Sequence, residues 1–190
     1  MANKIKYGIR NVHYAKATIA SNGTATYATP KALPGAKNIS LASQGESTPF
    51  YADDIIYWTG VSNTGYEGDL EIAMIPEDFY KDIFGEALDA NNIQYEDADA
   101  NSAPFALTFE FQGNENATRY VMYNCTAKRP DIAGQTKEAS IEPATEKISI
   151  TCSSIYVAAI SKNVVKAKCP ATQTTQYSTW NSSIYQPAST

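Results

Sequence analysis

The sequence predicts a mainly β protein: a β-sandwich or open barrel of two sheets with one short α-helix at about residues 76–84. Three observations lead to this fold class. Apolar residues recur at every second position in several short segments, which is the period of half-buried strands. Clusters of Gly, Pro, Asn, Asp and Ser separate these segments. Only one segment has a helical period, so about eight to ten short strands in two packed layers are expected.

The length favours a single domain over residues 1–190, because a chain of 190 residues supports one sizeable core and is short for two. With 43% hydrophobic residues and 13 Tyr, the chain has enough apolar surface to fold. Its N-terminal residues lack the apolar run of a secretory signal, and no stretch has the length of a membrane span. We therefore expect a protein that is made in the cytosol.

The first third of the chain has a simple alternating pattern. Ile5, Tyr7 and Ile9 alternate with polar residues, whereas Pro30 and Pro34 interrupt the pattern further on. The expected elements are, in order, a strand at 4–14 that turns at Asn11, a loop at 15–36 with at most one weak strand, a strand at 37–42, a loop at 43–54, and a strand at 54–61 that is buried on at least one side.

The period changes from strand to helix within residues 66–85. Glu67, Asp69 and Glu71 fall on one face of a strand, because successive side chains point to opposite faces. The opposite, apolar face consists of Tyr66, Leu70, Ile72 and Met74. In the helix that follows, Pro76 suits the first turn, Gly85 suits a left-handed end, and Phe79 and Ile83 form the face expected to pack on the core.

The second half of the chain contains the clearest hairpin. Phe105, Leu107, Phe109 and Phe111 line one face of its first strand, and residues 118–127 return after a turn. The other expected elements are an exposed loop at 86–103, an irregular stretch at 130–146 with brief pairing at 138–141, a strand through Ile148, Ile150 and Cys152, short strands at 155–160 and 163–168, and a tail at 170–190.

Side chains that could carry chemistry are scarce. His13 is the only histidine, so a triad has a single candidate base, and we expect a structural or surface role for it. Asp97, Asp99 and Asn101 have the spacing of a calcium loop, but Ser102 replaces its glycine, so a solvated acidic loop is expected. We predict no catalytic, cofactor or metal site. The three widely spaced cysteines, Cys125, Cys152 and Cys169, are expected to be reduced and mostly structural.

Charge excludes one further class of function. The formal net charge is −5, and such an acidic chain is a poor candidate for a domain that binds nucleic acid by neutralising phosphates.

Several motifs, in order along the chain, carry a family resemblance that spans most of residues 4–169. They are Lys6-Tyr7-Gly8-Ile9-Arg10-Asn11-Val12-His13-Tyr14-Ala15, Tyr51-Ala52-Asp53-Asp54-Ile55-Ile56-Tyr57, the passage at 66–85, Pro104-Phe105-Ala106-Leu107-Thr108-Phe109-Glu110-Phe111, Tyr123-Asn124-Cys125-Thr126-Ala127-Lys128-Arg129-Pro130 and Ser140-Ile141-Glu142-Pro143. With these motifs the chain resembles the major tail proteins, or tail tube proteins, of long-tailed bacteriophages, in particular the phi13-type group. Residues 14–36, 86–103 and the tail from Pro170 match this group weakly.

The resemblance implies a structural virion protein that assembles into stacked hexameric rings, forming the tail tube through which phage DNA is delivered. It also implies contact with tape measure, tail terminator and distal tail proteins, and a lumen through which DNA slides without specific binding. Glu67, Asp69 and Glu71 are the candidates for the lumen wall, although an exposed outer sheet face explains them equally well. The loop that resembles the family's inter-ring loop contributes Glu46, Phe50, Tyr51, Asp53 and Asp54; its aromatics could instead fold back onto the core.

Two other functions remain open from the residues. Surface Tyr and Trp side chains suit a carbohydrate-binding or adhesive β-sandwich, in which they would stack on sugar rings. A carboxylate-based glycosidase, for example with Asp53 and Asp54, is a more distant possibility. Near the C-terminus, Tyr177, Trp180 and Tyr185 could pack across subunits or anchor the tail to its own domain.

Overall fold

The computed structural model describes residues 5, 7–113, 117–134, 136 and 144–189, and it confirms the mainly β fold class. Its strands are β1 (Ile9–Ile19), β2 (Ala25–Tyr27), β3 (Lys31–Ala32), β4 (Ala36–Gln44), β5 (Ser47–Ala52), β6 (Ile55–Val61), β7 (Gly65–Ile72), β8 (Ala87–Leu88), β9 (Gln94–Tyr95), β10 (Phe105–Phe111), β11 (Arg119–Ala127), β12 (Glu146–Ser153), β13 (Ile155–Val157), β14 (Lys162–Val164) and β15 (Lys166–Cys169). The helical elements are α1 (Glu77–Phe79), the π-helix η1 (Tyr80–Phe84), the 3-10 turn η2 (Ala158–Ile160) and α2 (Thr174–Thr179).

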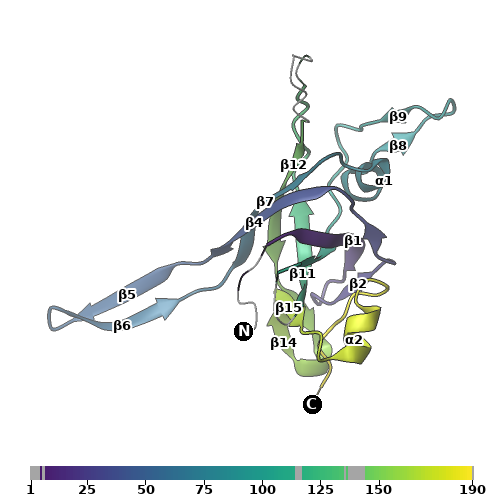
Figure 1. Cartoon of the computed structure of the whole chain (residues 1–190). Coiled ribbons are helices and arrows are strands. Elements are labelled where there is room, and N and C mark those ends of the chain that lie inside the picture. Colours follow the sequence, from purple (N-terminus) through teal and green to yellow (C-terminus); the bar gives the residue numbers. More distant parts are fainter. Residues whose placement is uncertain (1–4, 6, 114–116, 135, 137–143, 190) are drawn as a thin grey trace.

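One antiparallel sheet of nine strands organises the body of the molecule (Figure 1). Its strand order is β2-β1-β10-β11-β12-β7-β4, with β15 added to β11 and β3 added to β1. The sheet curls, because β4 at one end of this path also contacts β1. Three two-stranded hairpins complete the strands, β5–β6, β8–β9 and β13–β14, and the first of them projects far from the body.

Two hydrophobic clusters pack on the sheet. The larger one contains Phe105, Leu107 and Ile150, and the smaller one contains Val121 and Trp180. Strand β10 separates them: its alternate residues Phe105 and Leu107 belong to the first cluster, and Ala106 between them belongs to the second. Both faces of the hairpin β10–β11 are therefore covered, which explains why nearly every residue of β10 is buried.

The helical segment is shorter as an α-helix than the sequence predicts. Only Glu77–Phe79 is α-helical, and Tyr80–Phe84 continues as a π-helix before Gly85 ends it in a left-handed conformation. Pro76 is extended and caps the segment instead of opening its first turn. Phe79 and Ile83 are fully buried, and the wider π-turn also brings Phe84 against Phe79, with ring centroids 5.5 Å apart. The segment is held by packing in the larger cluster.

Strand β1 corrects the prediction for the N-terminal third. We expected a turn at Asn11, but the strand passes through this residue with a bulge, at a φ of 52°, and runs on to Ile19. Strands β2 and β3 also lie within the expected loop at 15–36. A bulge inserts one extra residue without ending the pairing, so the break in alternation at Asn11 does not mark the end of the strand. Residues 4 and 6 of the expected strand lie outside the described part.

Several expected loops also contain regular structure. The loop at 86–103 includes the small hairpin β8–β9, and the tail at 170–190 includes helix α2. Ser47–Ala52, within the expected loop at 43–54, is strand β5. Met74 follows β7 and is exposed, because the chain leaves the sheet at Ile72, two residues earlier. The pairing expected at 138–141 lies outside the described residues.

Candidate assembly surfaces

The segment at residues 45–64, which we call the hairpin arm, continues the pairing of β4 with β7 beyond the body. Strands β4 and β7 pair as far as Gln44 and Gly65, and β5 and β6 resume with Ser47 opposite Val61. Between them, the Ser62 amide donates to the Glu46 carbonyl over 2.9 Å, and the Thr64 amide donates to the Gln44 carbonyl over 3.0 Å. The arm is thus an extension of the sheet and not the loop predicted at 43–54.

Local residue choices allow the arm to form. At its base, a Cβ on Gly45 would lie 2.0 Å from the Ser62 carbonyl oxygen, so a larger residue does not fit between the strands. At its tip, Asp53 and Asp54 have φ values of 52° and 60°. Two consecutive positive φ values are the signature of a tight two-residue hairpin turn, which Asp tolerates. The Asp53-Asp54 pair therefore serves the turn.

The arm exposes seven large apolar side chains, distributed over both faces of its two strands. Each of them is more than half exposed: Phe50, Tyr51, Ile55, Ile56, Tyr57, Trp58 and Val61. Residues 54–61 are therefore not buried, contrary to the sequence prediction, and Phe50 and Tyr51 do not fold back onto the core. The only charged residues of the arm are acidic, namely Glu46, Asp53 and Asp54. Large exposed apolar patches of this kind mark interaction sites, because monomeric proteins rarely leave them in water.

The acidic strand β7 lies between β4 and β12, and its three carboxylates differ in environment. Asp69 accepts a hydrogen bond from Ser149 Oγ over 2.8 Å and lies 3.4 Å from Lys147 Nζ. Glu71 lies 2.7 Å from Lys37 Nζ and also accepts from Thr145. Glu67 is exposed. The three residues do share one face of the strand, but the neighbouring lysines neutralise part of their charge.

Residues paired with this acidic row extend it into a polar sheet face. Cross-strand partners point to the same side of a sheet. The polar sheet face consists of Asn38, Ser40, Ala42, Glu67, Asp69, Glu71, Asn124, Thr126, Lys147, Ser149, Thr151 and Ser153. It has no aromatic and no large aliphatic side chain, and its three carboxylates outnumber its one lysine, Lys147. The opposite side of the same strands is core, with Leu70, Ile148 and Ile150 fully buried.

The charge of Glu71 is fixed by its neighbours. The hydrogen bond from Lys37 lowers the pKa of this carboxyl most, and the hydrogen bond from Thr145 lowers it further. Glu71 therefore stays ionised at neutral pH.

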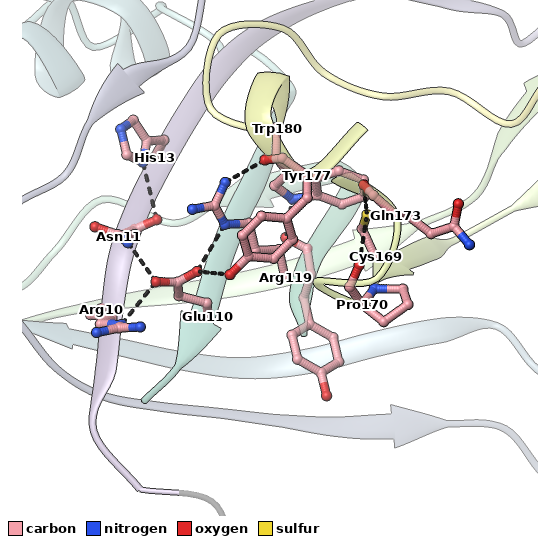
Figure 2. A network of polar contacts seen from close by, with 11 residues as sticks. Arg10, Asn11, His13, Glu110, Arg119, Cys169, Pro170, Gln173, Tyr177 and Trp180 are labelled. Carbon is pink, nitrogen blue, oxygen red and sulfur yellow. Dashed lines mark hydrogen bonds and ion pairs between the residues drawn. The ribbon is translucent and has the colours of Figure 1, made fainter. Parts of the chain in front are cut away.

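A second polar cluster ties the two ends of the chain together, and the sequence analysis missed it (Figure 2). Glu110 is almost fully buried, with Arg10 Nε 2.8 Å and Arg119 Nε 2.9 Å from its carboxylate oxygens. The Asn11 side-chain amide donates to it at 2.5 Å, and this contact depends on the bulge of β1. Burial alone would raise the pKa of Glu110, but the hydrogen bonds and charges of Arg119, Asn11 and Arg10 hold it below the ordinary value.

The C-terminal aromatics anchor the tail to the chain's own body. The Arg119 guanidinium lies over the Tyr177 ring, 3.9 Å from its centroid. Trp180 is buried, donates from Nε1 to the Tyr120 carbonyl over 3.3 Å, and stacks on Tyr185. Of the two alternatives for these residues, the structure supports the anchor.

The remaining candidate residues do not form a reactive constellation. His13 Nδ1 lies 3.0 Å from the Asn11 carbonyl oxygen, in the strand bulge. Asp97 accepts a hydrogen bond from the Asp99 amide of its own loop. Over the described ranges, no group of three or more His, Cys, Asp or Glu side chains is placed to hold a metal ion. No helix in that part of the chain has the length and apolar character needed to cross a membrane.

A comparison with family models gives a match over nearly the whole chain. The matching model is described as phage tail tube protein, and it covers residues 2–184. This range includes the hairpin arm, the polar sheet face and the Glu110 cluster. No curated protein matches the chain significantly.

Proposed function

This chain belongs to the phage tail tube protein family, and from that premise we propose that it assembles into stacked hexameric rings that form a tube for DNA delivery. Family membership makes it a structural component of the virion tail, and the family is not one of enzymes. We propose that the whole chain acts as one tail tube domain, made in the host cytoplasm. The observation that carries the assembly proposal is the exposed apolar hairpin arm.

The size of the arm suits a contact between subunits. Burying one large apolar side chain contributes about 1.5–3 kcal/mol to the free energy of association. Each of the seven side chains of the arm is still more than half exposed, so a partner could bury that remaining surface. The gross gain is on the order of 5–10 kcal/mol per arm. Association costs about 4–15 kcal/mol in lost freedom of motion, so one docked arm barely balances this cost. Stable tubes therefore need the arm and a second contact together.

Edge strands offer the second contact. Strand β4 ends the path of the main sheet; part of it approaches β1, and the backbone groups along the rest of its outer edge are the ones that a neighbouring subunit would pair with. Head-to-tail pairing of this kind closes a ring when the rotation per subunit divides a full turn. In this proposal the β4 edge serves ring closure, and the hairpin arm reaches the adjacent ring.

The polar sheet face is the candidate for the lumen wall. It lies directly beside the β4 edge, so ring closure there would join the polar sheet faces of neighbouring subunits. Ser, Thr and Asn side chains with a slight excess of carboxylates offer no cationic cluster for phosphates. Repulsion acts only within about 8 Å at physiological salt, which is enough near a wall to keep DNA from sticking. DNA then slides without specific binding.

Electron microscopy of purified protein tests the assembly proposal. We expect rings or tubes of uniform diameter in a concentration series, with a matching rise in light-scattering mass. Tape measure, tail terminator and distal tail proteins are the further partners that we propose, and any of them could be added as an initiator. A protein that remains monomeric with these partners, and instead binds glycans through its exposed Tyr57 and Trp58, would contradict the proposal and favour a carbohydrate-binding module.

A further inference from the structure

Two of the three cysteines face each other across neighbouring strands. Cys125 of β11 and Cys152 of β12 are direct partners in the antiparallel register, and their sulfur atoms are 3.2 Å apart. Both residues are fully buried in the larger hydrophobic cluster. The third thiol lies elsewhere: Cys169 Sγ contacts the carbonyl oxygens of Pro170 and Gln173.

We propose that Cys125 and Cys152 form a disulfide site, reduced in the host cytosol and oxidised by peroxide once the protein is outside the cell. The backbone already has the required spacing. Opposed residues in antiparallel strands have Cα atoms about 4.5 or 5.5 Å apart, and both values lie within the roughly 4.4–6.8 Å range of disulfides. The two sulfur atoms need to approach by only about 1 Å to reach the bond length.

The reaction balances with hydrogen peroxide as the oxidant. One thiol loses its proton, and the thiolate attacks a peroxide oxygen and breaks the O–O bond; this gives a sulfenic acid and a hydroxide, which takes up the released proton to become water. The second sulfur then attacks the sulfenic sulfur, the S–S bond forms and a second water leaves. Both thiols are oxidised and the peroxide is reduced to two waters, so no further reactant is needed.

Burial sets the pace of this reaction. It raises the pKa of the Cys125 thiol, and the adjacent Cys152 raises it further. Because the thiolate is the nucleophile, oxidation should be slow at neutral pH and faster in mildly alkaline buffer. The site thus differs from a catalytic dithiol, which reacts quickly.

The disulfide would join β11 and β12 on the core side of the sheet, opposite the polar sheet face. Asn124, Thr126, Thr151 and Ser153 of that face are neighbours of the two cysteines on β11 and β12. The bond would close a loop between positions 27 apart in the sequence. Such a closure is expected to raise Tm by on the order of 5–10 °C. It requires no tube assembly, so it can be tested independently of the proposed function.

Intact-mass and peptide analysis of the folded wild-type protein tests the site. After incubation with hydrogen peroxide, we expect a loss of two hydrogens in mass and a tryptic cross-link between residues 120–128 and residues 148–162. The variant C169S should still form this cross-link, whereas C125S and C152S should not, and dithiothreitol should reverse both the cross-link and the rise in Tm. Links through Cys169, or native protein that stays reduced where urea-unfolded protein oxidises, would overturn the proposal.

Discussion

Phe50 and Trp58 lie directly opposite each other in the hairpin arm, and they remain 58% and 61% exposed. The Trp58 indole covers Gly60, since a Cβ there would lie 2.5 Å from Trp58 Cη2. The arm thus presents an aromatic pair on an ordered ribbon before any partner binds. A preformed contact of this kind loses less side-chain freedom on association than a flexible loop does.

Trp58→Ala should block assembly without unfolding the subunit. Trp58 is exposed, so its removal should change the free energy of unfolding by no more than about 0.5 kcal/mol. Aromatic side chains that become buried in an interface are typical hot spots. The threshold, which is the lowest protein concentration at which tubes form, should therefore rise at least about thirtyfold, which corresponds to a loss of roughly 2 kcal/mol in the free energy of association. Light scattering and thermal melts measure the two effects.

Ile93→Ala is the matched control for this substitution, because Ile93 is exposed to the same degree in the separate β8–β9 region. It should leave the threshold unchanged. Equal effects of the two substitutions would contradict a specific role for the arm.

Gly68→Ala should destabilise the subunit itself. A Cβ at position 68 would lie 1.8 Å from the Ser40 carbonyl oxygen, so β4 and β7 would have to separate locally. Such overpacking lowers the free energy of unfolding by about 1–3 kcal/mol. Gly134→Ala provides the control, because nothing lies within 4 Å of its added Cβ. Urea titrations should show a lower midpoint for the first variant only, and equal midpoints would be evidence against this close strand contact.

Glu110→Gln should weaken the subunit and flatten its response to acid. The pKa of Glu110 lies below the ordinary value of 4.5. Its contribution to stability is therefore fully present above that value and is lost as the pH falls through the lower folded pKa. At neutral pH the substitution should cost about 2 kcal/mol, less than the roughly 3–5 kcal/mol of a fully buried pair, because Arg10 is half exposed.

Denaturation curves between neutral pH and strong acid measure this effect. Wild type should lose stability more steeply than the variant below the ordinary pKa. Glu67→Gln, at an exposed carboxylate, serves as the control and should follow the wild-type curve. Parallel curves for wild type and Glu110→Gln would rule out a role for the Glu110 charge.

Charge reversal in the polar sheet face tests the lumen assignment. The triple change of Glu67, Asp69 and Glu71 to Lys would place new cations beside Lys37 and Lys147, and it would break two ion pairs. Glu67→Lys alone avoids this problem, because Glu67 is exposed and opposite Ala42 and Thr151. Virions that carry it should assemble normally and deliver DNA more slowly. Unchanged delivery kinetics would count against a lumen position for this residue.

Much of the body could be predicted from the sequence, because its strands follow a simple rule. Ile148, Ile150 and Cys152 alternate and are buried as expected. The prediction from alternation fails where the backbone departs from regular strand or helix geometry. The bulge at Asn11 shifts the alternation without ending β1, and the π-turn changes the period of the helical segment. Neither irregularity has a composition that distinguishes it from a turn or a helix end.

The hairpin arm could not be predicted for a different reason. Ile55, Ile56 and Trp58 have the composition of a buried strand, but the structure leaves them exposed, as is common at interaction sites. The turn-forming Asp53-Asp54 pair was an available signal for a hairpin, although not for its exposure. The partners of Glu110 could not be predicted either. The sequence shows one carboxylate in an apolar strand, and it does not indicate which distant segments lie beside it in the fold.

A cryo-electron microscopy reconstruction of the tail of a phage that carries this chain tests the central claim most directly. The account predicts six copies per ring, with the polar sheet face lining the channel and the hairpin arm, including Phe50 and Trp58, buried against an adjacent ring. A tail whose wall lacks this chain, or whose subunits leave the arm in solvent and turn the polar sheet face outward, would contradict it.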